Sequence, residues 1–426
     1  MKIIPSSISS IQHLFRQSSK IKLATSLLIG SALVVSSGCQ DKGWIKDVNF
    51  IAKVTQEEID TAMADKGLTQ LTGLAECDVK LFQIEYESVG VDGEPVDLSA
   101  AFSIPVGPGC DGPFPLLADG HGTRTKAGYT EASVENMMLD HAIFTSHGYV
   151  SVNVDYVGLG TSDYDYHPFL HRDSEARSMI DGLRAARHMA LALGVELSGK
   201  VMLKGFSQGG HTAMATQREI EANYLDEFDL VASAPMAGPF ELEATFVDAF
   251  NTPAIPNSSA GVLFSYTLQS YQNIYGTMYD ELSDVALPSS EPIIANGFPG
   301  ELSVLEFIMS GLLPNDPTLA LQADFIDDFV SGVHPMREAL AQNEVSDFIP
   351  QTPMMLCSSR YDGVVPHFNS EYAQAKFFAG GAQVPLVDVA DFIPEIPGQD
   401  SGLVHHLSAK PICYATIKNQ FFDLLK

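Results

Sequence analysis

The sequence Gly-Phe-Ser-Gln-Gly at residues 205–209 follows a strand-like run at 200–204 and precedes a helix-compatible stretch at 210–224. A serine between a strand and a helix must turn the chain sharply, and the flanking glycines relieve the crowding at that turn. Such a turn presents Ser207 at the carboxyl edge of a sheet, with a helix amino terminus behind it. The alternative, a glycine-rich turn with an incidental serine, does not explain why an aspartate and a histidine follow in the order that a catalytic triad requires.

Strand-like and helix-like segments alternate on both sides of this turn. The strand-like runs are apolar without alternation, which is typical of strands buried on both faces. Apolar residues recur at helical spacing from Asp173 or Ser174 to Leu193, and Gly194 ends this helical pattern. The alternation predicts an α/β fold with a mostly parallel sheet and helices on both faces. The predicted strands are 79–86, 96–104, 114–118, 149–154, 200–204, 230–234, 353–357 and 384–389.

Residues 240–350 show no strand rhythm and mix helical stretches with turn signals. A gap of about 110 residues is too long for an ordinary connection between two strands. We interpret it as an inserted, mainly helical cap, and a core of unusual shape with long loops is the alternative. The predicted core then has two parts, residues 75–239 and 351–426, and a last helix at 408–425.

A serine hydroxyl is a weak nucleophile that needs a base within hydrogen-bond reach, and the base needs an orienting carboxylate. On a strand–turn–helix elbow the order along the chain is serine, then Asp or Glu, then His. Asp362 follows the predicted strand at 353–357, in the turn Tyr-Asp-Gly. An aspartate before glycine is also a common turn residue without a catalytic role. We predict that Asp362 orients the base.

Two adjacent histidines, His405 and His406, follow the last predicted strand and precede the last predicted helix. Only one of them can face Ser207, and we prefer His406 because it is nearer to the start of that helix. His405 remains the alternative. The histidines earlier in the chain do not fit the order of serine, carboxylate and histidine.

The negative oxygen of a tetrahedral intermediate needs preorganised hydrogen-bond donors. One candidate is the backbone N–H of Gln208, directly after the serine at a helix amino terminus. The second should come from the loop after the strand at 114–118, and we predict the backbone N–H of Thr123 in Gly-His-Gly-Thr. A plain His-Gly turn is the alternative for this loop.

Together these motifs resemble the α/β-hydrolase superfamily, and most closely its secretory-lipase-like serine esterases. The resemblance extends from about residue 75 to the carboxyl terminus, apart from the cap. The segments that carry it are Gly-His-Gly-Thr at 120–123, Asp-Tyr-Val-Gly-Leu-Gly at 155–160, His-Pro-Phe-Leu at 167–170, Ser-Glu-Ala-Arg at 174–177 and Gly-Phe-Ser-Gln-Gly-Gly-His at 205–211.

The resemblance implies hydrolysis of carboxylic esters through an acyl-enzyme, with a cap over the acyl pocket and without a cofactor. It assigns Ser207 as nucleophile, Asp362 and His406 as its partners, and the Thr123 and Gln208 amides as oxyanion donors. It also implies that 155–160 and 167–170 are structural supports. Two alternatives stay open: a serine peptidase of the same fold, and a non-catalytic binding protein on a hydrolase scaffold.

The chain carries 24 basic and 53 acidic residues, with a net charge of −29. Such a surface repels nucleic acids and anionic lipid headgroups, so a nucleic-acid partner is not expected. The excess of acidic residues otherwise indicates solubility and carries no catalytic information. The expected partner is a small-molecule or lipid ester.

The first residues of the chain are typical of a targeting segment. Basic residues precede an apolar run at 23–35, which is too short to span a bilayer and predicts a signal peptide at 1–38. Small residues before Cys39 resemble the lipobox of bacterial lipoproteins, although Ser36 stands where that pattern prefers leucine. We therefore predict an exported protein with a membrane anchor at a lipidated Cys39, in the cell envelope (periplasm or outer membrane) or secreted. Ordinary signal cleavage is the alternative, and 39–74 is predicted to be a spacer.

The four remaining cysteines suit disulfides in an oxidising compartment. Cys77 and Cys110 flank the predicted hairpin of strands 79–86 and 96–104, so they can meet at its open end. Cys357 would then pair with Cys413. Neither a Cys-x-x-Cys motif nor a Cys/His cluster indicates a metal site.

Overall fold

The structure is a computed structural model that describes residues 42–252, 259–395 and 401–426. The predictions for the signal peptide at 1–38 and for Cys39 lie outside these residues. Within the described part of the chain, no helix combines the length and the apolar character needed to cross a membrane.

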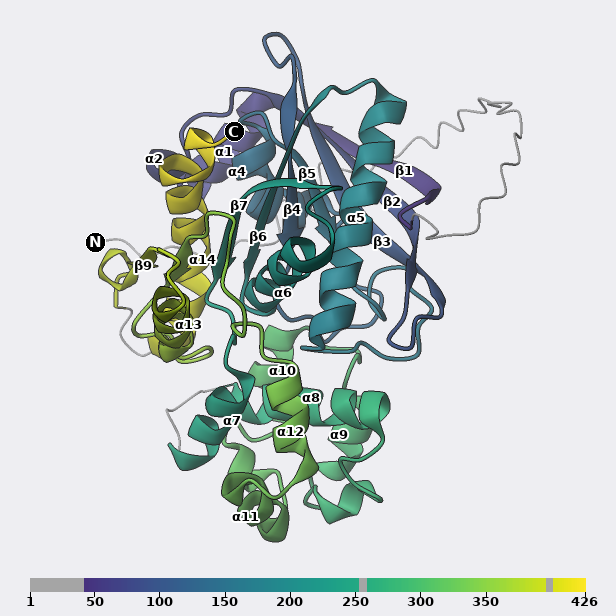
Figure 1. The fold of residues 1–426 in the computed structure, drawn as a ribbon, viewed down its shortest axis with the longest axis vertical. Helices are drawn as coiled ribbons and strands as arrows, with labels where there is room; N and C mark the ends of the chain where they lie inside the picture. Colours follow the sequence, from purple (N-terminus) through teal and green to yellow (C-terminus); the bar gives the residue numbers. More distant parts are fainter. Residues whose placement is uncertain (1–41, 253–258, 396–400) are drawn as a thin grey trace. The chain divides into compact units, whose positions relative to one another are not determined.

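The described residues form a nine-stranded sheet in the order β1-β2-β3-β5-β4-β6-β7-β8-β9 (Figure 1). The pairs β1–β2, β2–β3 and β3–β5 are antiparallel, and all pairs from β5 to β9 are parallel. The mostly parallel α/β sheet predicted from the sequence is therefore confirmed. The strands are β1 Ile45–Val54, β2 Asp78–Val89, β3 Pro95–Val106, β4 Phe114–Gly120, β5 Val150–Val154, β6 Leu197–Phe206, β7 Asp229–Met236, β8 Leu356–Ser358 and β9 Leu386–Asp388.

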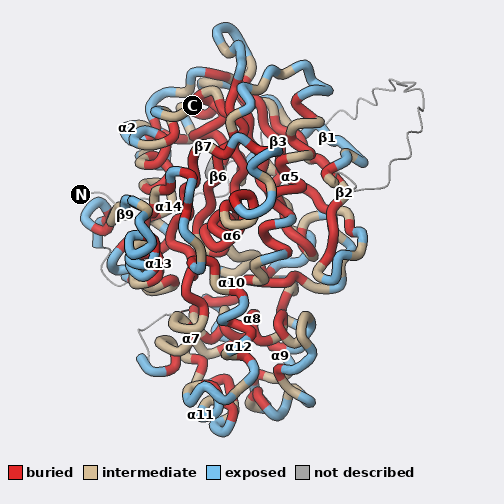
Figure 2. The backbone as a smooth tube through the Cα atoms, viewed as in Figure 1, coloured by how far each residue is buried: buried red, intermediate tan, exposed pale blue. Residues whose placement is uncertain are grey.

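The strands in the middle of the sheet are buried along most of their length (Figure 2), and an apolar cluster lies on each face of the sheet. Helix α5 (Arg172–Leu193) packs on one face, where Met179 and Leu183 are buried among strand residues. Helix α14 (Ser401–Gln420) packs on the other face. The remaining α-helices in the described residues outside the 240–350 segment are α1 Gln56–Asp65, α2 Thr69–Thr72, α3 Val134–Asn136, α4 Ala142–Thr145, α6 Gln208–Asn223 and α13 Phe368–Ala379.

The predicted spacer at 39–74 is wrong over most of its length, because this segment belongs to the fold. Strand β1 pairs along β2, from Ile45 opposite Tyr86 to Val54 opposite Val79. Most of β1 is exposed, as an edge strand can be, so its sequence lacks the apolar run that marks the central strands. Helix α1 begins with a capping box at Thr55 and Glu58.

Two helix starts differ from the predictions. The amino cap of α5 is His171, whose side chain accepts from Ser174 N–H, rather than Asp173 or Ser174. Gly194 ends this helix with φ of 68°, as predicted. Helix α14 begins at Ser401 instead of 408, so His405 and His406 lie on the helix and not in a loop. A proline such as Pro411 usually marks a first turn, but here it lies inside the helix.

Between β7 and β8 the described residues contain helices and no strand of the sheet. We call this segment, from α7 to α12, the helical insertion; it lies beyond one end of the sheet, below the strands in Figure 1. It has its own apolar cluster, in which Phe264, Phe329 and Leu340 are fully buried. Its α-helices are α7 Leu242–Asn251, α8 Ala260–Tyr275, α9 Glu291–Asn296, α10 Val304–Ser310, α11 Ala323–Ser331 and α12 Pro335–Gln342.

Both predicted disulfides are present. Cys77 and Cys110 are joined across the open end of the β2–β3 hairpin. Cys357 on β8 is joined to Cys413 on α14, which ties the helix that carries both candidate histidines to the sheet.

The chain returns from the helical insertion at Glu344, which lies close to other charged groups. Burial and the nearby Glu241 carboxylate raise the pKa of Glu344 to about 7, although Lys376 opposes this shift. A folded-state pKa above the unfolded value of 4.5 means that stability is lost as the pH rises through about 7. Glu344→Gln should therefore stabilise the protein by about 1–2 kcal/mol above pH 8, allowing for solvent screening. Urea unfolding at pH 4 and pH 8 tests this; an equal gain at both pH values would contradict it.

Candidate active site

Ser207 lies at a strained turn between β6 and α6. Its φ is 62° and its ψ is −123°, a conformation that non-glycine residues rarely adopt. A Cβ atom on Gly209 would lie 1.8 Å from the Gly120 carbonyl oxygen, and one on Gly205 would lie 1.9 Å from the Gly209 oxygen. The two glycines of the motif are therefore required because backbone segments cross there in direct contact.

His406 lies between Ser207 and Asp362. Its Nε2 is 3.1 Å from Ser207 Oγ, and its Nδ1 is 2.7 Å from Asp362 Oδ2. The other carboxylate oxygen of Asp362 accepts the backbone N–H groups of Val364 and Val365, each at 2.9 Å. Because Nδ1 donates to the carboxylate, Nε2 is left as an acceptor for the serine hydroxyl. Asp362 and His406 are both buried, and Ser207 is half-buried.

His405 faces a different group. Its Nδ1 lies 2.9 Å from Ser359 Oγ, and its ring packs against the edge of Tyr361. On a helix, adjacent residues point about 100° apart, so one of the pair must turn away when the other faces the serine. The geometry thus brings His406, and not His405, to Ser207.

The loop after β4 passes over the same turn. A Cβ on Gly122 would lie 3.7 Å from Ser207 Cβ, so Thr123 follows directly beside the serine. The His121 ring contacts the Tyr156 ring, and the Tyr156 hydroxyl donates to the His121 carbonyl oxygen at 3.1 Å, which fixes this loop. Gln208 is the first residue of α6, where backbone N–H groups lack partners within the helix. The two predicted oxyanion donors therefore lie on adjacent segments.

Two other histidines near the turn are buried and neutral. Burial lowers the pKa of His121, and it lowers the pKa of His167 to about 4. They therefore add no positive charge beside the serine at neutral pH. Within the described residues, no group of three or more His, Cys, Asp or Glu side chains is arranged to hold a metal ion.

Two pockets meet at Ser207 and share Thr123, Leu263 and Val364. The α7 pocket has a cavity volume of about 70 Å³, and the α10 pocket about 140 Å³. The α7 pocket is further lined by Phe169, Leu170, Gln208, Pro239, Thr245, Phe246, Asp248, Ala249, Thr252, Ala260, Gly363, Val365 and Pro366. The α10 pocket is further lined by Gly122, Arg124, Phe206, Ser259, Val304, Leu305, Ile308, Leu403, His406, Leu407 and Lys410.

The sequence indicated no individual role for Glu175. It is in the first turn of α5, is 1% exposed, and accepts hydrogen bonds from Leu170 and from Gln208, the residue after Ser207. The sequence signal that could have indicated its burial is its place beside Ala176 and Met179, which lie on the buried face of the same helix. A buried carboxylate there needs specific partners.

A nine-stranded, mostly parallel sheet with a serine at a strained strand–helix turn defines an α/β-hydrolase. The family model described as secretory lipase matches residues 124–421, which is more than half of the chain. The chain belongs to the secretory lipase family, and with it to the carboxylic ester hydrolases.

Solved structures agree with this assignment. A ligand-bound form of the rice cell wall degrading esterase LipA from Xanthomonas oryzae is 37% identical, with a TM-score of 0.83 over 90% of this chain and 99% of that one. Candida antarctica lipase A in its closed state is 16% identical, with a TM-score of 0.58 over 81% of this chain and 76% of that one, and shares the fold. No match was found among curated proteins.

Proposed function

We propose that this chain hydrolyses carboxylic esters through an acyl-enzyme on Ser207. The observation that carries the proposal is the position of His406, whose two ring nitrogens contact Ser207 Oγ and Asp362 Oδ2. An imidazole held in this way can take the serine proton as the hydroxyl attacks an ester carbonyl. The secretory lipase family model and the LipA structure support an ester as the substrate.

The reaction then proceeds in two displacements. Ser207 Oγ attacks the carbonyl carbon while His406 Nε2 takes its proton, and the N–H groups of Thr123 and Gln208 hold the negative oxygen. The tetrahedral intermediate collapses, the bond to the alcohol oxygen breaks, and His406 gives its proton to that oxygen. Water, deprotonated by His406, then attacks the acyl carbon; the bond to Ser207 Oγ breaks, His406 returns the proton to that oxygen, and the acid is released. Asp362 stays ionised and stabilises the imidazolium.

The position of His406 also supports a role for each of the two pockets. The leaving oxygen must receive its proton from His406 Nε2, so the alcohol lies on the side of the serine where that histidine is. His406 lines the α10 pocket and does not line the α7 pocket. The alcohol therefore occupies the α10 pocket and the acyl chain the smaller α7 pocket, with the helical insertion as the cap that forms a wall of each.

Matched substitutions test this assignment. Ala249→Phe narrows the α7 pocket and should lower kcat/KM for ethyl octanoate relative to ethyl acetate by about 10- to 100-fold, because a pocket contact of this size is worth 1–3 kcal/mol. Val304→Phe narrows the α10 pocket and should lower kcat/KM for octyl acetate relative to ethyl acetate by the same factor. A selective loss on octyl acetate in Ala249→Phe, together with a selective loss on ethyl octanoate in Val304→Phe, would contradict the assignment.

We further propose that residues 1–38 direct export and that Cys39 carries a lipid anchor. The apolar run at 23–35, the small residues before Cys39 and the secretory lipase family support this proposal. Cys39→Ala should move the protein from the membrane fraction to the soluble fraction of the expressing bacterium. Unchanged membrane association of Cys39→Ala would contradict the lipid anchor.

A comparison of substrates tests the proposed function itself. The purified protein should hydrolyse p-nitrophenyl acetate and butyrate, and it should leave anilides and short peptides with the same acyl groups intact. Faster cleavage of the amides would identify a peptidase of this fold instead. Absence of turnover together with no labelling by a fluorophosphonate would indicate a binding protein.

A further inference from the structure

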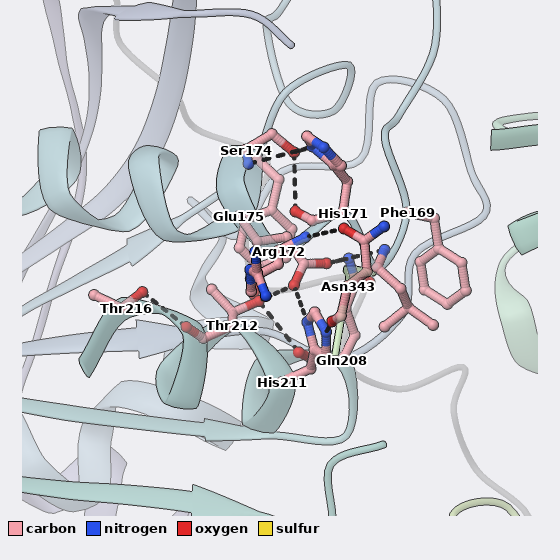
Figure 3. A network of polar contacts seen from close by, with 12 residues as sticks. Phe169, His171, Arg172, Ser174, Glu175, Gln208, His211, Thr212, Thr216 and Asn343 are labelled. Atoms are coloured by element: carbon pink, nitrogen blue, oxygen red, sulfur yellow. Dashed lines mark hydrogen bonds and ion pairs between the residues drawn. The ribbon is translucent and has the colours of Figure 1, made fainter. Parts of the chain in front are cut away.

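Glu175 connects the strained serine turn to the loop that lines the α7 pocket (Figure 3). One carboxylate oxygen accepts the Leu170 N–H at 3.2 Å and the Gln208 Nε2 at 2.8 Å. The other accepts His211 Nδ1 at 2.7 Å and the Thr212 hydroxyl at 2.9 Å. Four donors from two segments therefore converge on one carboxylate that solvent does not reach.

Gln208 is held in one orientation by this arrangement. Its Nε2 lies 2.8 Å from Glu175 Oε1 and 2.9 Å from His167 Nε2. His167 Nδ1 donates to the Val157 carbonyl oxygen at 2.7 Å, so its Nε2 can accept. Both hydrogens of the Gln208 amide nitrogen are thus used. A flipped amide would point its oxygen at a carboxylate, which excludes that orientation.

His211 connects Glu175 to the helical insertion. Its Nδ1 contacts the Glu175 carboxylate and its Nε2 contacts the Asn343 carbonyl oxygen at 2.9 Å. The Nδ1–Oε2 contact becomes an ion pair when the imidazole is protonated. Burial opposes ionisation of Glu175, but the charge and hydrogen bond of His211 and the hydrogen bond of Gln208 keep the pKa of Glu175 below its usual value. The carboxylate is therefore charged at neutral pH.

We propose that Glu175 is a positioning residue, which fixes Gln208 and thereby the backbone N–H that stabilises the oxyanion. The inference rests on the proposed function of Ser207. Gln208 follows a serine with a φ of 62°, and a turn in such a conformation persists only where surrounding contacts hold it. Hydrogen bonds to an ionised, buried acceptor are stronger than those to a neutral one. Glu175 supplies that acceptor for the Gln208 side chain and for two residues of the following helix.

Glu175→Gln is the direct test. The substituted amide keeps the size of the side chain, but it places an N–H donor against two of the four donors and removes the negative charge of the acceptor. We expect kcat for p-nitrophenyl butyrate to fall by about 10- to 100-fold, with KM changed by less than about threefold. The reason is that a displaced Gln208 N–H stabilises the transition state less but leaves binding of the substrate almost unchanged. The rate constant of fluorophosphonate labelling at Ser207 should fall by a similar factor.

Glu221→Gln provides a matched control on α6, the helix that carries Gln208 and His211. Glu221 is also buried and accepts from the backbone of Gln351 and Thr352 and from Gln217 Nε2 at 2.8–2.9 Å, but it lines neither pocket. Glu221→Gln should lower the melting temperature and leave both the labelling rate and kcat unchanged. A purely structural role of Glu175 would lower the labelled fraction and leave the labelling rate of the folded molecules unchanged.

A second variant keeps the test decisive if Glu175→Gln does not fold. Gln208→Met retains the backbone N–H and the length of the side chain but removes its hydrogen bonds to Glu175 and His167. It should slow labelling by about 10-fold with full labelling amplitude. Labelling rates within twofold of the unmodified protein in every variant that folds would overturn the inference. The unmodified protein would still be labelled at Ser207, which separates this failure from a failure of the proposed function.

Discussion

His406→Ala is expected to lower kcat for p-nitrophenyl butyrate by about 10⁵-fold, because loss of the base of a serine triad removes almost all of its nucleophilic catalysis. His405→Ala, one residue away on the same helix, should change kcat by less than about threefold, since an independent side chain outside the reacting groups has little effect. The reason for the contrast is geometric. The His406 ring spans Ser207 and Asp362, whereas His405 contacts Ser359.

Circular dichroism and the melting temperature of both variants provide the control for folding. Both histidines are buried on α14, so both substitutions should reduce stability by comparable amounts. Equal losses of kcat in the two variants, with folding intact, would show that the pair has been assigned wrongly. A large loss confined to His405→Ala would identify His405 as the base.

Ser207→Ala should have the same magnitude of effect, a loss of about 10⁵- to 10⁶-fold in kcat, because no other group can form the acyl-enzyme. The substitution should leave the backbone strain at this turn almost unchanged, because alanine disfavours a φ of 62° as serine does. The folded protein should therefore keep its substrate affinity, measured by competition with a non-hydrolysable phosphonate. The Ser207→Ala, His406→Ala double variant should be no slower than either single variant, because the residues act as a unit.

The central strands and the serine turn could be predicted because their sequence signals are local. The runs that become β4, β5, β6 and β7 are mostly apolar and buried over most of their length, so their few polar residues do not obscure the strand pattern. Gly205 and Gly209 are where backbone segments touch, which no other residue allows. The position of Asp362 after β8 followed from the order of the motifs, and the structure brings it to His406.

Other features depended on contacts that a local pattern does not contain. Most residues of β1 are exposed, so its sequence lacks an apolar run and was interpreted as part of a spacer. Its pairing with β2 is what makes it a strand. The start of α14 was predicted too late, at 408 instead of Ser401. Glu175 has partners at Gln208 and His211, which lie 33 and 36 residues later in the chain.

Mass spectrometry of the protein inactivated by a fluorophosphonate tests the central claim most directly. The full chain is incubated with the reagent, digested, and the modified peptide is sequenced. The account predicts one adduct per molecule on Ser207, formed together with loss of esterase activity and slowed strongly in His406→Ala but not in His405→Ala. An adduct on another residue, or full esterase activity in a protein modified at Ser207, would contradict it.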